Sequence, residues 1–199
     1  MSDNEQKHQQ RMAKKKAIVD EKIAKAQEER GVLILLKGNG KGKSSSALGT
    51  MARSLGYGKK CAVIQFIKGR NETGEQKFFQ DHPLVDWHVM GHGFTWETQN
   101  REQDILSSKE AWLSAKALLA DDSFDLVVLD ELTYLLHYDY LEEDQVLDAI
   151  MQRPDTQHLV VTGRGASDSL IEIADTVSDI KEIKHAFKRG IKAQKGLEF

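Results

Sequence analysis

The sequence predicts an α/β fold, with a mostly parallel central sheet that carries helices on both faces. Several apolar runs are continuous rather than alternating, as expected for strands covered on both sides. From Gly31 onward these runs alternate with helical patterns, and that order favours parallel strands joined by crossover helices. A chain of 199 residues, 40% of them hydrophobic, is long enough for one compact domain with a substantial core.

The expected elements follow one another without an internal repeat or a low-complexity linker. The first strand contains the apolar run 32–36 and leads into a glycine-rich loop. Ligands in such sheets bind beyond the carboxyl ends of the strands. We expect strands at 32–37, 60–67, 85–90, 124–130, 158–162 and 176–183, and helices at 43–55, 101–120, 142–152 and 167–174.

Residues 1–30 differ in composition from the rest, and we treat them as a separate N-terminal part before a domain at 31–199. They contain Lys14, Lys15 and Lys16 and many Gln and Glu residues, with only a thin apolar stripe. We expect disorder at first and then a helix over about 11–30. It is either a solvated tail or a helix that covers an active site, on its own or a partner subunit.

The glycine-rich loop is the strongest functional signal. Residues 38–45 read Gly-Asn-Gly-Lys-Gly-Lys-Ser-Ser, directly after the first strand. Glycines let successive N–H groups point at one anion, Lys43 can reach phosphate oxygens, and the Ser44 hydroxyl can hold Mg²⁺. The standard Gly-x4-Gly-Lys-Ser/Thr pattern is one residue longer, because Lys37 stands where its first glycine should fall. The loop therefore indicates binding of nucleotide phosphates and a P-loop NTPase (RecA-like) type of fold, although its spacing is one residue shorter than the ordinary pattern.

Two further strand ends carry polar side chains toward the same edge. The run 126–129 is apolar and ends in Asp130 and Glu131, as in a Walker B element, where acids hold Mg²⁺ or orient a nucleophile or shell water. The strand at 158–162 ends in Gly163-Arg164-Gly165, and Arg164 either contacts phosphate or belongs to an ordinary turn.

Three other segments allow two readings each. Phe94 and Trp96 lie in the loop 91–101, where they either pack under the loop or form a wall for a flat ligand. The polar loop 68–75 contacts a ligand or is a plain connection. Asp86, His88 and Gly91 fit Asp-x-His-x-x-Gly, a motif that supplies histidine to cobalt in corrinoid-dependent mutases, but here the motif falls mostly inside a predicted strand.

Composition excludes several classes of protein. The net charge of −3 gives no reason to expect nucleic acid or an anionic membrane as a partner. Cys61 is the single cysteine, so neither an intrachain disulfide nor a cysteine metal cluster is expected. The N-terminus lacks the apolar core of a signal peptide, and no apolar run approaches the length of a membrane span. We expect a cytoplasmic protein.

Together the motifs resemble the P-loop type of ATP:corrinoid adenosyltransferase, the CobA/BtuR family. The resemblance covers about residue 26 to the C-terminus, and more weakly the N-terminal helix, and it includes the short phosphate loop. The family usually has Thr-Thr where this chain has Ser44-Ser45, and serine keeps the hydroxyl. The resemblance rests on six segments: the phosphate loop at 38–45, Val-Ile-Gln-Phe-Ile-Lys-Gly at 63–69, Gly-Phe-Thr-Trp-Glu-Thr-Gln-Asn at 93–100, Leu-Asp-Glu-Leu-Thr-Tyr at 129–134, Thr-Gly-Arg-Gly at 162–165 and Lys-His-Ala-Phe at 184–187.

The resemblance implies transfer of the 5′-deoxyadenosyl group of ATP to cobalt of a reduced cob(I)alamin or related corrinoid, with release of triphosphate, in adenosylcobalamin synthesis or salvage. It implies that ATP lies reversed relative to ordinary P-loop enzymes. It also implies a homodimer, an N-terminal helix that closes over the corrinoid site, and a reduced flavoprotein as electron donor. Phe94 and Trp96 would displace the lower ligand of cobalt(II), which eases its reduction.

The site residues expected on this basis fall into three sets. Mg²⁺ is the expected ion and Mn²⁺ the alternative, and ATP and the corrinoid are substrates. The sets are a catalytic one of Lys43, Phe94, Trp96 and Arg164, a nucleotide-binding one of Gly38, Asn39, Gly40, Lys41, Gly42, Lys43, Ser44, Ser45 and Arg164, and a metal-binding one of Ser44, Asp130 and Glu131.

Two other functions compete with this one. A P-loop ATPase, a kinase or a RecA-like motor that binds nucleic acid needs the ordinary phosphate loop and usually a basic face, and this sequence indicates neither. A corrinoid carrier that uses His88 leaves the phosphate loop and the acidic pair unexplained.

Overall fold

The computed structural model describes residues 3–67, 72–89 and 101–198. The chain divides into two compact units, Met1–Arg30 and Gly31–Phe199. In the first unit, helix α1 spans Asp3–Lys25. It begins earlier than the helix expected at 11–30, because residues 3–10 contain no glycine or proline and several helix-forming Glu, Gln and Lys residues, and it ends earlier, at Lys25. Ion pairs four residues apart, Lys16–Asp20 and Lys25–Glu21, support it modestly.

The second unit is built on a six-stranded sheet in the order β3-β2-β4-β5-β1-β6, and every pairing is parallel. The expected α/β class is confirmed, and all six expected strands are present, most of them shorter than predicted. The strands are β1 (Leu33–Lys37), β2 (Cys61–Gln65), β3 (Val85–Val89), β4 (Leu126–Asp130), β5 (His158–Thr162) and β6 (Thr176–Asp179).

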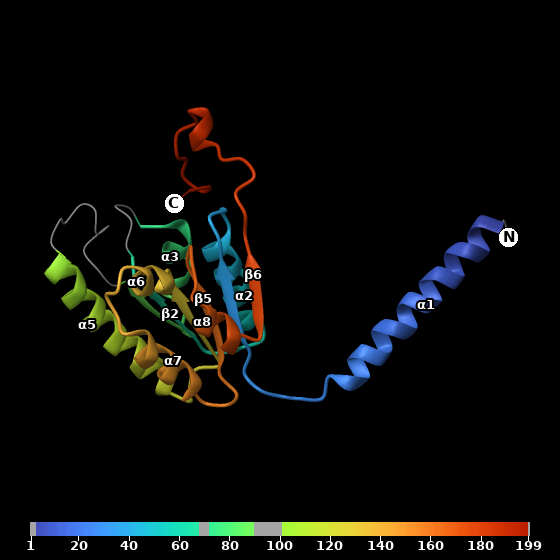
Figure 1. Ribbon diagram of the computed structural model, residues 1–199, viewed down its shortest axis with the longest axis horizontal. Coiled ribbons are helices and arrows are strands. Elements are labelled where there is room, and N and C mark those ends of the chain that lie inside the picture. Colours follow the sequence, from blue (N-terminus) through green and yellow to red (C-terminus); the bar gives the residue numbers. More distant parts are fainter. Residues whose placement is uncertain (1–2, 68–71, 90–100, 199) are drawn as a thin grey trace. The chain divides into compact units, whose positions relative to one another are not determined.

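Helices cover both faces of this sheet, and Figure 1 shows α2 on one side and α5 and α7 on the other. The four helices expected in this unit are confirmed, while α3, α6 and the short 3₁₀ turn η1 were not predicted. The bounds are α2 (Lys43–Gly56), α3 (Gly74–Phe79), α5 (Arg101–Ala120), α6 (Leu132–His137), α7 (Glu143–Met151), α8 (Asp168–Ile173) and η1 (Phe187–Arg189).

Two apolar clusters fill the space between the sheet and its helices. One lies under α2 and α3 and includes Met51, Val63 and Val128. The larger one lies under α5 to α8 and includes Trp112 and Leu129. The four central strands β1, β2, β4 and β5 are largely buried, which explains their continuous apolar runs, whereas the edge strands β3 and β6 are more exposed and carry polar residues.

The strand order separates the two motifs that the sequence singled out. The phosphate-loop strand β1 and the acidic strand β4 are not neighbours, because β5 pairs with both of them. The residues that follow β5 therefore stand between the phosphate loop and the acidic pair. Among the helices that the structure describes, none has the length and apolar composition of a membrane span.

Candidate active site

The phosphate loop connects the carboxyl end of β1 to the start of α2. Gly42 precedes the helix with a φ of 120°, a conformation that favours glycine. The first N–H groups of a helix have no partner inside it and lie at the positive end of its dipole, so this end suits an anion. Lys43 is buried and donates from Nζ to the carbonyl oxygen of Gly40 at 2.9 Å. Ser44 is half-buried and Ser45 exposed.

The beginning of the loop is held by backbone hydrogen bonds to neighbouring segments. The Gly38 N–H donates to the carbonyl of Arg164 at 2.9 Å, and the Gly40 N–H donates to that of Ile180 at 2.7 Å. A Cβ at Gly38 would lie 2.4 Å from the Ile180 oxygen, so the position admits no side chain. Gly38 and Gly40 thus shape the loop, and the N–H groups left for an anion come from the rest of the loop and from α2.

The acidic pair lies at the carboxyl end of β4. Asp130 is buried, and Glu131 is half-buried and caps the start of α6 in the left-handed conformation, with φ 62° and ψ 24°. That conformation costs a residue with a side chain roughly 1 kcal/mol. Burial and the neighbouring Asp130 raise the pKa of Glu131, while the positive charges of Lys43 and Arg164 oppose that rise. The Glu131 carboxyl group therefore lies within electrostatic reach of both cations.

The end of β5 joins the acidic pair through the fully buried Thr162. Its hydroxyl donates to Asp130 Oδ1 at 2.7 Å and accepts the Glu131 N–H at 2.9 Å. The other oxygen of Asp130 accepts from Gln65 Nε2, at the end of β2, at 3.3 Å. Neither Thr162 nor Gln65 was predicted as a site residue. Thr162 ends the predicted strand 158–162, Gln65 falls inside the predicted strand 60–67, and both lie in segments on which the family resemblance rests.

The segment after Thr162 continues toward the phosphate loop. The Gly163 N–H donates to the carbonyl of Leu36 in β1 at 3.2 Å, and the Arg164 carbonyl receives the Gly38 N–H. The Arg164 side chain is exposed, and its charge acts on both Glu131 and Glu182. The predicted nucleotide-binding loop, the acidic pair and Arg164 thus meet at one edge of the sheet.

Gly163 is also in close contact with α6. A Cβ at this position would lie 1.8 Å from Oγ1 of the buried Thr133, so the backbone approach depends on the missing side chain. Thr133 Oγ1 has no hydrogen-bond partner in the described part of the chain. The contact fixes the path of the strand end that leads to Arg164.

Phe94 and Trp96 lie outside the described residues, and so do residues 68–71 of the polar loop at 68–75. The first residue of α5, Arg101, is described: its side chain donates to the carbonyl of Tyr138 at 3.4 Å and lies 5.9 Å from the centre of the Tyr140 ring. These tyrosines follow α6, which begins directly after the acidic pair. The contact of Arg101 with these tyrosines was not predicted, because the residues lie 37 or more positions apart in the sequence and no local pattern links them.

His88 occupies the middle of β3, as the sequence suggested. Its Nε2 lies 2.9 Å from Asp86 Oδ1, on the same strand. A position inside a paired strand differs from the loop in which the cobalt-binding motif occurs. Among the described residues, no three His, Cys, Asp or Glu side chains form a ready metal site.

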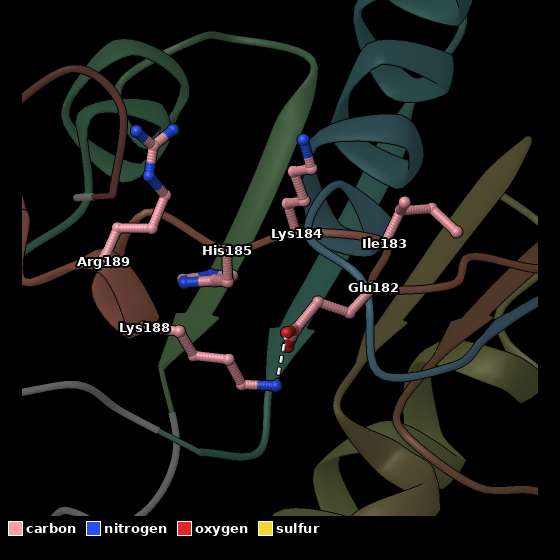
Figure 2. Close-up of a pocket in the computed structure, with 6 residues that line it drawn as sticks. All are labelled: Glu182, Ile183, Lys184, His185, Lys188 and Arg189. Carbon is pink, nitrogen blue, oxygen red and sulfur yellow. Dashed lines mark ion pairs between the residues drawn. The ribbon is translucent and has the colours of Figure 1, made fainter.

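The segment after β6 returns to the phosphate loop. Besides the Ile180 carbonyl, it brings Glu198, whose carboxylate lies 2.8 Å from Lys41 Nζ. Figure 2 shows a hollow within this segment, where Lys188 reaches across to pair with Glu182 at 2.5 Å. The hollow measures about 420 Å³ and is lined by Glu182, Ile183, Lys184, His185, Lys188 and Arg189.

Comparison with known proteins decides the family. The model of the family described as ATP:corrinoid adenosyltransferase BtuR/CobO/CobP matches residues 29–199, and one described as Cob(I)alamin adenosyltransferase N terminal matches residues 1–23. The chain belongs to the ATP:corrinoid adenosyltransferase family. The resemblance seen in the sequence motifs is therefore confirmed.

Relatives in this ATP:corrinoid adenosyltransferase family match nearly the whole chain. A corrinoid adenosyltransferase of Pseudomonas aeruginosa is 59% identical, over 99% of this chain and 98% of that protein. The corrinoid adenosyltransferase of Escherichia coli K12 and the corrinoid adenosyltransferase CobA of Salmonella typhimurium are each 47% identical, over 98% of this chain and 100% of those proteins. The transferase class expected from the motifs follows from this membership.

The close approach at Gly163 generates a stability prediction. The added methyl group of Gly163→Ala must displace buried Thr133, and overpacking of this kind costs about 1–3 kcal/mol. We expect a melting temperature lower by several degrees, measured by thermal unfolding.

Two controls accompany this measurement. Gly165→Ala should leave the melting temperature nearly unchanged, because a Cβ there meets nothing within 4 Å. Adding Thr133→Ala to Gly163→Ala should recover part of the loss. An unchanged melting temperature in Gly163→Ala would show that the contact is not tight.

Proposed function

We propose that this protein transfers the 5′-deoxyadenosyl group of ATP to the cobalt of a reduced cob(I)alamin or related corrinoid and releases triphosphate. The observation that carries the proposal is the shared sheet edge, in a member of this family, where the phosphate loop, Arg164 and Glu131 come together. That edge offers cations and N–H groups for a triphosphate next to a carboxylate for a metal ion. The product belongs to adenosylcobalamin synthesis or salvage.

In the proposed reaction, the electron pair of cobalt(I) forms a bond to the 5′ carbon of ATP. The bond between that carbon and the triphosphate oxygen breaks, and its electron pair leaves with the triphosphate. The departing chain gains negative charge, which Lys43, Arg164 and the N–H groups at the start of α2 are suited to stabilise. Lys43 would exchange its present acceptor, the Gly40 carbonyl, for phosphate oxygens.

The reaction activates no water, so it requires no general base. Glu131 is therefore better suited to a metal ion than to proton abstraction. We propose that ATP binds in the reversed orientation expected from the sequence, with its 5′ carbon turned toward the corrinoid.

The oxygen ligands at this edge fit Mg²⁺, with Mn²⁺ as the alternative. Mg²⁺ prefers one or two protein oxygens together with substrate phosphates, and the Ser44 hydroxyl and the Glu131 carboxylate supply such oxygens. Both oxygens of Asp130 already accept hydrogen bonds, from Thr162 and Gln65. We therefore assign the metal to Ser44 and Glu131, and we give Asp130 of the predicted set a supporting role. When bound, Mg²⁺ neutralises charge on the triphosphate.

Several parts of the proposal extend beyond the described residues. Phe94 and Trp96 would displace the lower ligand of cobalt(II), because apolar rings cannot bind cobalt and exclude water. A reduced flavoprotein would supply the electron. The enzyme would act as a homodimer in the cytoplasm, and the N-terminal unit would close over the corrinoid.

The proposal is tested by anaerobic incubation of the protein with ATP, Mg²⁺ and chemically reduced cobalamin, with the cobalamin spectrum as the readout. Adenosylcobalamin and triphosphate should form in equal amounts. Absence of adenosylcobalamin under strong reductant would refute the proposal. Steady hydrolysis of ATP to ADP and phosphate without corrinoid would favour a P-loop ATPase, and corrinoid binding that needs His88 but no ATP would favour a carrier.

Lys43→Ala should reduce transfer by roughly 100-fold or more, because the triphosphate loses the cation of a buried side chain in the phosphate loop. ATP affinity, measured by calorimetry, should fall as well. Lys59→Ala is the matched control, since Lys59 lies just before β2, at the opposite end of the strands, and pairs with Asp125. Normal ATP affinity and turnover in Lys43→Ala would contradict the assignment.

Phe94→Ala and Trp96→Ala should mainly impair the reduction of cobalt(II). Transfer should drop when the reaction starts from cobalt(II) and a weak reductant, and it should be largely restored when cobalt(I) is supplied directly. Phe78→Ala serves as a control, because Phe78 is an exposed aromatic residue of α3. Equal losses from both cobalt states would mean that the two aromatic residues only support the fold.

A further inference from the structure

Thr162 uses both hydrogen-bonding capacities of its hydroxyl within the acidic pair. It donates to Asp130 Oδ1 at 2.7 Å and accepts the N–H of Glu131 at 2.9 Å. A hydroxyl has one proton and two lone pairs, so one side chain can fix a carboxylate and the following backbone group together. Thr162 is fully buried, and no water competes for these bonds.

Glu131 needs such a bond because its backbone is left-handed. A non-glycine residue keeps this conformation only where its surroundings enforce it, and such residues gather at functional sites. Its carbonyl accepts from the Tyr134 N–H at 3.2 Å, inside α6, and its N–H donates to Thr162. The turn between β4 and α6 is thus held on one side by the helix and on the other by the Thr162 hydroxyl.

Asp130 is held by a second hydrogen bond, from the end of β2. Gln65 Nε2 donates to its second oxygen at 3.3 Å, and Asp130 is only 5% exposed. The two acids therefore differ: Asp130 is bound to the ends of β2 and β5, and Glu131 lies within reach of the charges of Lys43 and Arg164.

We propose that Thr162 is the positioning residue of the metal site. By joining Asp130 to the backbone of Glu131, its hydroxyl holds the turn that aims the Glu131 carboxylate at the phosphate loop. Thr162 touches neither metal nor nucleotide and acts only through Glu131. This inference rests on the proposed metal-dependent transfer and adds to it the residue that orients the metal ligand.

The test compares Thr162→Val, which removes the hydroxyl at nearly constant shape, with Thr162→Ser, which keeps it. Loss of an outer partner of a metal ligand typically weakens metal affinity roughly 10–100-fold. We expect Thr162→Val to weaken binding of Mn²⁺ to the protein–ATP complex by that factor, measured by electron paramagnetic resonance. ATP affinity without metal should stay within about two-fold of the unmodified protein, and Thr162→Ser should restore Mn²⁺ binding.

A second readout needs neither metal nor substrate. Amide hydrogen exchange at Glu131 in the free protein should accelerate in Thr162→Val, because its N–H loses the acceptor, and should stay slow in Thr162→Ser. Thr133→Ala is the matched control: it removes another buried hydroxyl, one without a hydrogen-bond partner in the described residues. It should change the melting temperature but leave the exchange at Glu131 slow.

The outcomes separate this inference from the proposed function. Unchanged Glu131 exchange or unchanged Mn²⁺ affinity in Thr162→Val would overturn it, even if the unmodified protein forms adenosylcobalamin. Equal losses of metal-free ATP binding and Mn²⁺ binding would also overturn it, because they indicate a purely structural role. Failure of the proposed function would show instead as a lack of adenosylcobalamin with the unmodified protein.

Discussion

The site depends on a line of hydrogen bonds across the carboxyl ends of four parallel strands. It runs from Gln65 at the end of β2, through Asp130 of β4, to Thr162 at the end of β5, and two residues later the Arg164 carbonyl accepts the N–H of Gly38 after β1. A parallel sheet brings the carboxyl ends of its strands to one edge. These hydrogen bonds hold the segments that follow the strands in place relative to one another. The phosphate loop and the acidic pair are not on adjacent strands, so their spacing is set by what lies at the end of β5.

This arrangement explains why Asp130 and Glu131 have different environments. Burial makes an unpaired carboxylate costly, and Asp130 is stable there because both of its oxygens are bound. Glu131 is less buried and has cations nearby, which is the environment of a group that meets a ligand. The proposed transfer needs such a split, since one acid must keep its geometry while the other exchanges partners.

The sequence was sufficient for the fold class and all six strands, and for locating the phosphate loop and the acidic pair at strand ends, because continuous apolar runs and glycine spacing are local signals; the roles of these residues stay predictions. The sequence did not predict α3, which begins inside the segment interpreted as a polar loop at 68–75, or α6, which begins directly after the acidic pair. It also placed the N-terminal helix at 11–30 rather than at Asp3–Lys25. The roles of Thr162 and Gln65 were also missed. Each depends on which strands are neighbours, and strand order is a long-range property that no short motif contains. The roles of Phe94 and Trp96 stay predictions.

The backbone bonds of the phosphate loop have a consequence for how this edge tolerates substitution. Where the bond is made by backbone atoms, as at Gly38 and Gly40, every side chain introduces the same obstacle, a Cβ, whatever its chemistry. Where the bond is made by a side chain, as at Thr162, a substitution is tolerated to the extent that it keeps the hydroxyl. A saturation library should therefore be uniformly intolerant at the two glycines and graded at the threonine.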